Sequence, residues 1–165
     1  QDKLYMKLTP IAGWLVKRQE GEELLLRFFA FSEWYPSYSD KKGISKQLDD
    51  YMKEKNSIFN EEMEKEMSEK FNITMNFVNK CYPYGFAKKE NAKQVARPYF
   101  EALSVGAYLA LKENPDLLIS KDKAKKLLMN ESFITSVSGK YQTHKAKTIR
   151  ERIDYVKDGL KKYSN

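Results

Sequence analysis

The chain has 165 residues and is poor in the side chains that build most catalytic and metal centres. Its one cysteine, Cys81, excludes an internal disulfide and a cysteine-rich zinc cluster. Its one histidine, His144, excludes a metal site made of several histidines. No apolar run approaches the roughly 18 residues of a membrane-spanning helix, and no signal peptide opens the sequence. We therefore expect a cytoplasmic protein that has no metal, no cofactor and no contact with a membrane.

Glycine and proline are also scarce, with seven and five residues, and strong helix formers dominate the chain. No segment alternates apolar and polar residues for long enough to predict a strand, and no repeat or flexible linker divides the sequence. We predict an all-α fold, a single irregular bundle of seven or eight helices that spans residues 1–165. Because the sequence begins at Gln1 without an initiator methionine, we interpret it as a fragment of a longer protein.

Apolar spacing and capping residues place the predicted helices. Pro10 would begin a first helix that Gly21 ends, with Trp14 and Leu15 on its inner face. Residues 22–35 are apolar around most of the circumference, which is typical of a central, buried helix. The remaining predicted helices cover residues 44–52 and 57–81, a stretch from Asn91 or from near Arg97 to Glu113, two short segments capped by Ser120 and Asn130, and a last segment from Thr143.

The charge is spread unevenly along the chain. Residues 1–80 carry 13 basic and 14 acidic side chains, whereas residues 81–165 carry 17 basic and 9 acidic ones. A basic half favours an anionic partner, through steering and through the release of counterions. The alternative is that lysines, which outnumber arginines by 25 to 5, only keep the helix surfaces soluble.

Basic residues gather where the last predicted helix begins. The positive end of a helix dipole disfavours cations unless an anion is bound there. The sequence therefore predicts a nucleic-acid site. The alternative is a solvated loop whose lysines extend into water, while Arg150 and Arg152 pair with neighbouring carboxylates. The candidate residues are Lys140, His144, Lys145, Lys147 and Arg150.

Arg27 is the only cation in the apolar segment 22–35. A buried guanidinium without a partner is very costly, so a carboxylate or backbone carbonyls must meet it. We predict a structural ion pair at Arg27 in preference to a ligand contact. The acidic segment 61–69 has no accompanying histidine, so a ferritin-like metal site is not expected.

Five stretches of the sequence resemble a known family in their residues, their order and their spacing. They are residues 22–31 (EELLLRFFAF), 48–52 (LDDYM), 84–87 (YGFA), 100–103 (FEAL) and 149–153 (IRERI). Together they resemble the helical C-terminal region of the GmrSD-type (DGQQR-motif) proteins of anti-phage restriction. In one departure, Gly85-Phe86-Ala87 reverses the order of aromatic residue and alanine that is usual in this family.

The resemblance implies a ParB/sulfiredoxin-like N-terminal module, whose Asp-Gly-Gln-Gln-Arg signature serves nucleotide hydrolysis. Many members also end in a His-Asn-His nuclease module. Neither signature occurs in these residues, so no catalytic residue of the family is carried over. The resemblance therefore implies a non-catalytic helical domain of a modification-dependent restriction or phage-defence protein, which packs on the missing module and contacts DNA.

Two other classes of function are alternatives to this hypothesis. A pure protein–protein scaffold would make no contact with nucleic acid, and would expose an apolar patch through which the chain forms a homo-oligomer. An autonomous enzyme is disfavoured, because no pair of residues offers the nucleophile and base, or the metal ligands, that catalysis requires.

Overall fold

The computed structural model describes residues 2–138 and 144–164, and within them every regular element is a helix. This confirms the predicted all-α fold. The described part holds nine α-helices and one 3-10 turn, η1. They are α1 (Lys3–Leu8), α2 (Gly13–Val16), α3 (Glu20–Trp34), η1 (Asp40–Lys42), α4 (Ile44–Ile58), α5 (Glu61–Cys81), α6 (Arg97–Glu113), α7 (Lys121–Leu128), α8 (Glu131–Ser136) and α9 (Ala146–Tyr163).

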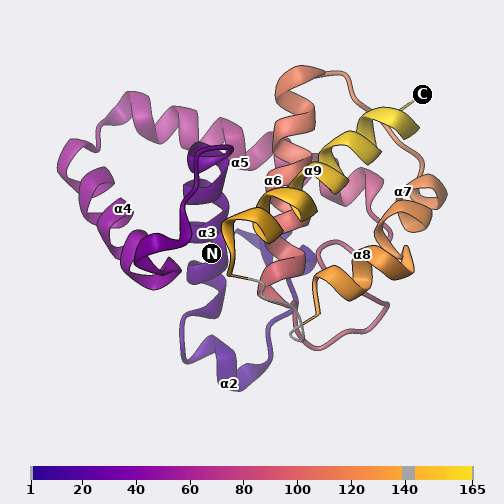
Figure 1. Cartoon of the computed structure of the whole chain (residues 1–165), viewed down its shortest axis with the longest axis horizontal. Helices are drawn as coiled ribbons and strands as arrows, with labels where there is room; N and C mark the ends of the chain where they lie inside the picture. The colour runs from indigo at the N-terminus through magenta and orange to yellow at the C-terminus, as the bar shows by residue number, and fades with distance from the viewer. Residues whose placement is uncertain (1, 139–143, 165) are drawn as a thin grey trace.

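Helix α6 lies at the centre of the packing and contacts α3, α5 and α9, as Figure 1 shows. Its sequence explains this position, because most of its residues are apolar or small on every side. At Gly106 the backbone of α6 approaches α9 so closely that an added Cβ would lie 2.8 Å from the Cβ of Val156. The sequence predicts that α3 is the central helix. Instead, one side of α3 packs against α6, and α4 covers the other side of α3.

The first predicted helix is wrong. Pro10 lies between two short helices, and Gly21 lies inside α3. Asp2 caps α1 by accepting a hydrogen bond from the backbone N–H of Tyr5, so the chain becomes helical before Pro10 is reached. The left-handed backbone of Gln19 (φ 55°) then separates α2 from α3. This replacement of one predicted helix by two accounts for the larger number of helices.

Capping residues decide most of the remaining boundaries. Ser120 and Asn130 cap α7 and α8 as predicted. The long helix begins at Glu61, not at residue 57, because the side chain of Asn60 accepts a hydrogen bond from the N–H of Met63. Of the two predicted starts for α6, the one near Arg97 is correct, since Pro98 suits a first helical turn. Thr143 lies outside the described residues, and α9 begins at Ala146.

The turn after α5 joins the end of α1 through a very close backbone contact. The N–H of Phe86 donates to the carbonyl oxygen of Leu8 at 2.9 Å. Gly85 has a φ of +58°, and a Cβ added there would lie 2.7 Å from that same oxygen. Both the left-handed backbone and the short distance require glycine at this position.

Replacing Gly85 should therefore destabilise the protein for two separable reasons. We expect Gly85→Ala to lower the free energy of unfolding by roughly 2 kcal/mol, as measured by urea denaturation. Asparagine tolerates a left-handed backbone but still has a Cβ. Gly85→Asn should thus lose nearly as much stability as Gly85→Ala, and full stability in Gly85→Asn would contradict the role of the close contact.

Candidate functional site

A buried ion network joins the three central helices. Arg27 of α3 places its Nη1 2.7 Å from Oε1 of Glu101 on α6, and the second carboxylate oxygen of Glu101 pairs with Arg152 of α9. All three side chains are less than a tenth exposed. A charge so deep in an apolar core is tolerated because each group has a partner of opposite sign.

The network continues to the surface at the start of α3. Arg27 also pairs with Glu23 at 2.8 Å, and Arg97 pairs with Glu20 at 2.6 Å and with Glu23 at 3.1 Å. The network thus contains three arginines and three glutamates. The hydrogen bond to Glu20 raises the pKa of Arg97, whereas burial lowers the pKa of Arg152. Because the carboxylates are engaged by guanidinium groups, this network holds helices together and offers no free base or nucleophile.

Sequence reasoning predicted an ion pair for Arg27 and favoured a carboxylate partner for Arg152, but it did not identify Glu101 as the partner of both. A signal for Glu101 was present, since it is the only charged residue between Arg97 and Lys112 in an otherwise apolar stretch. A single cation in one apolar helix and a single anion in another are expected to pair with each other. Arg152 gave no such signal, because it stands among the other charges of the last helix.

The residues predicted to contact nucleic acid are engaged with protein groups where their contacts are described. Lys145 lies 3.4 Å from a carboxylate oxygen of Asp40, and Lys147 lies 3.8 Å from Glu151. Arg150 donates from Nη1 to the backbone oxygen of Tyr38 at 2.9 Å. His144 is exposed, and Lys140 lies outside the described residues.

Tyr35, Asp154 and Lys157 form a second polar cluster, between the end of α3 and α9. Tyr35 donates a hydrogen bond to Asp154, and the Nζ of Lys157 lies 3.2 Å from the same carboxylate. Burial and the hydrogen bond to Asp154 raise the pKa of Tyr35. Although burial lowers the pKa of Lys157, its contacts with Tyr35 and Asp154 raise it more. The tyrosine therefore stays protonated and the lysine stays charged at neutral pH, so the cluster fixes α9 to α3.

Lys70 and Ser32 lie close together on α5 and α3. The Nζ of Lys70 donates to Oγ of Ser32 at 3.3 Å, and that hydroxyl donates to the backbone oxygen of Phe29 at 2.8 Å. A nucleophilic serine needs its lysine to accept the proton, which is the opposite direction.

No group of three or more histidine, cysteine, aspartate or glutamate side chains in residues 2–138 and 144–164 is placed to hold a metal ion.

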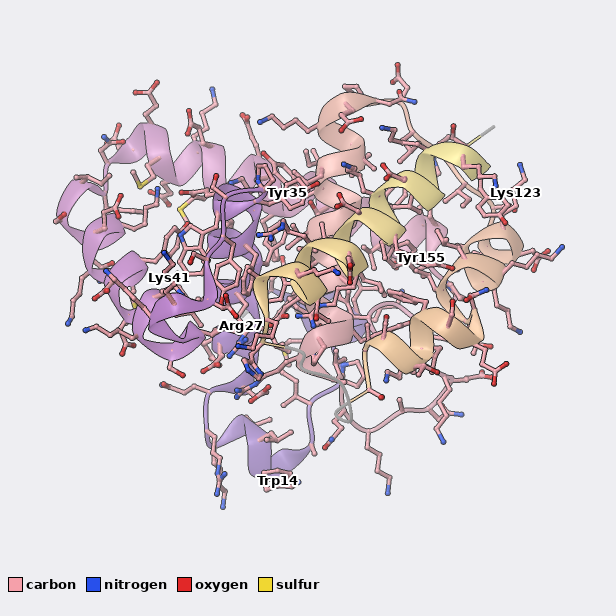
Figure 2. All side chains as sticks on the ribbon, in the orientation of Figure 1. Trp14, Arg27, Tyr35, Lys41, Lys123 and Tyr155 are labelled. Carbon is pink, nitrogen blue, oxygen red and sulfur yellow. The ribbon has the colours of Figure 1, made fainter. Side chains whose placement is uncertain are left out.

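An apolar groove lies where α1, α2, α3 and α5 meet, and its volume is about 340 Å³. We call the surface around it the apolar face. Its apolar lining residues are Tyr5, Met6, Ile11, Val16, Leu25 and Phe71. Met6 and Val16 are each 55% exposed. Trp14, 59% exposed, stands at the outer tip of α2 beyond the bundle, as Figure 2 shows, although the sequence predicted that it would face inward.

In the described part of the chain, no helix combines the length and the apolarity that crossing a membrane requires. Comparisons of the chain with protein-family models, with curated proteins and with solved structures give no match.

Proposed function

We propose that this chain is a non-catalytic helical module that docks onto another protein module through its apolar face. In this proposal the parent is a GmrSD-like, modification-dependent restriction or phage-defence protein. The docking partner is the N-terminal nucleotide-hydrolysing module of that same protein. The helical module holds and orients this partner and performs no chemistry of its own.

The observation that carries the proposal is the exposure of large apolar side chains next to a groove that other apolar side chains line. Met6 and Val16 both line the groove and are more than half exposed, and they lie on neighbouring short helices. Contiguous apolar surface of this kind is typical of a site where another protein docks. Aromatic residues and methionine are also the side chains that interfaces favour.

The contact with DNA that the sequence predicts has less support. Lys145 and Lys147 lie near carboxylates, and Arg150 binds the backbone at Tyr38. A phosphate would have to compete with each of these contacts. We therefore base the proposed function on the apolar face alone.

The proposal predicts that polar substitutions on the apolar face weaken docking. In Met6→Ser/Val16→Ser, both side chains line the groove but are more than half exposed before the change, so we expect the fold to be kept. We expect the affinity for the N-terminal module of the parent protein, measured by isothermal titration calorimetry, to fall at least about tenfold.

A matched control separates this surface from apolar exposure in general. Met52 and Phe59, on and just after α4, are 45% and 54% exposed but lie outside the groove. Met52→Ser/Phe59→Ser should leave the affinity unchanged. Equal losses in the two double variants, or no binding of the unchanged chain to the module, would overturn the proposal.

Light scattering distinguishes the docking function from the alternative, a scaffold that associates with copies of itself. A homo-oligomer that Met6→Ser/Val16→Ser converts to a monomer, together with no binding to the N-terminal module, would favour a self-associating scaffold. A monomer that binds the module supports the docking function.

A further inference from the structure

A second groove, of about 430 Å³, lies on a surface that the proposed function does not use. The end of α1, the end of α5, the turn that follows α5 and the start of α7 form its walls. We call it the lysine groove. Its polar side chains come from residues far apart in the sequence: Lys7, Asn79, Tyr84, Lys89, Glu90, Asn91 and Lys121.

The lysines of this groove are exposed and have no carboxylate partner in the described part of the chain. Lys7 donates to the side-chain oxygen of Asn79 at 3.2 Å, and neither Lys89 nor Lys121 forms an ion pair there. In contrast, the described lysines near the start of α9 lie beside carboxylates. Glu90 is the one acidic residue that lines the groove, so the lining carries an excess of positive charge.

The positive surface continues along α7. Lys125 follows Lys121 by four residues, which places the two side chains on the same face of the helix. The Nζ of Lys125 lies 5.9 Å from the centre of the ring of Tyr84, which itself lines the groove. A ligand that follows this surface would meet Lys125, Lys121 and then the groove. Its several cations suit an extended anion better than a single phosphate ion.

A backbone hydrogen bond joins two walls of the lysine groove, the end of α1 and the turn that follows α5. The N–H of Phe86 donates to the carbonyl oxygen of Leu8, and Leu8 and Gly85 both line the groove. The groove therefore exists before a ligand arrives, and only the ends of long side chains must be ordered on binding.

The composition of the lining favours nucleic acid over an acidic protein. Lysine, asparagine and tyrosine side chains are common donors to backbone phosphates. Protein interfaces, in contrast, are depleted of lysine. We propose that the lysine groove binds the phosphate backbone of DNA without reading its sequence, with Lys7, Lys89 and Lys121 as the phosphate contacts. This inference does not depend on docking through the apolar face, and its variants leave that face intact.

The test measures binding of the chain to a fluorescein-labelled 20-base-pair DNA duplex of arbitrary sequence, by fluorescence anisotropy at 50 to 200 mM NaCl. For Lys7→Gln/Lys89→Gln/Lys121→Gln we expect binding at 50 mM NaCl to weaken at least about tenfold. We also expect the slope of log affinity against log salt concentration to fall by about 2 to 3, because each lost phosphate contact removes about 0.9.

The control variant removes the same number of positive charges from a different part of the surface. Lys46→Gln/Lys53→Gln/Lys65→Gln replaces three exposed lysines of α4 and α5 that lie outside the groove. It should leave the salt slope within about one of the unchanged protein. Circular dichroism melting checks that both triple variants fold.

Three results would overturn the inference. The first is no binding of the unchanged chain at 50 mM NaCl. The second is an equal loss in the two triple variants, which would mean that only net charge matters. The third is displacement of the duplex by poly-glutamate at the same concentration of negative charge, which would assign the groove to an acidic protein.

Discussion

Glu101→Ala should be one of the most destabilising single substitutions in this chain. The change leaves Arg27 and Arg152 buried without the carboxylate that pairs with both of them. Removing one partner of a buried ion pair costs about 3–5 kcal/mol. For a chain of this size we expect the melting temperature to fall by roughly 6–20 °C, as measured by differential scanning calorimetry.

Two further variants separate charge from volume and from surface pairing. Glu101→Gln keeps the volume of the side chain but removes its charge, so it should lose most of the same stability. Glu113→Ala removes a glutamate that pairs with Lys161 on the surface, and should cost less than about 1 kcal/mol. Glu101→Gln melting like the unchanged protein would contradict the structural role of the ion network.

Gly106→Val should also be strongly destabilising, because it forces α6 and α9 apart. A Cβ at residue 106 would lie 2.8 Å from the Cβ and Cγ1 of Val156, and 3.1 Å from the backbone oxygen of Ile153. The oxygen belongs to the helix backbone and cannot move alone. We expect a loss of about 3 kcal/mol in the free energy of unfolding, measured by urea denaturation.

The matched control is Gly13→Val in α2, where nothing lies within 4 Å of an added Cβ. The change in the free energy of unfolding should stay within about 0.5 kcal/mol.

Gly106→Ala tests whether a smaller side chain at this position stabilises or destabilises the protein. Alanine in an open helix is about 1 kcal/mol more stable than glycine. A stabilising Gly106→Ala would therefore contradict the close packing of α6 on α9.

The parts of the fold that the sequence predicts well depend on signals carried by neighbouring residues. Ser120 and Asn130 cap their helices locally, and the apolar stripe of α9 through Ile149 and Val156 is buried as its spacing indicates. The i, i+4 pair of Lys147 with Glu151 is likewise local, and is present at 3.8 Å.

The parts that it predicts poorly depend on competition or on distant partners. Trp14 is apolar but stays exposed, because α2 is only four residues long and makes its main helix contact with α3. Phe59 continues the apolar spacing of α5, yet the cap at Asn60 ends that continuity.

The candidate sites are harder to predict than the helices, for the same reason. The lysine groove joins residues as distant as Lys7, Lys89 and Lys121, and no local pattern brings them together. Conversely, the cations at the start of α9 are adjacent in sequence, but Asp40 and the backbone at Tyr38 reach them from more than a hundred residues away.

Hydrogen exchange measured by mass spectrometry tests the central claim, that this module holds a partner through its apolar face. The experiment compares the isolated chain with the full-length parent protein. The account predicts slower exchange in the parent for the amides of α1, α2 and the first turns of α3, with no change in α4. Equal exchange of α1 and α2 in the two proteins would contradict it.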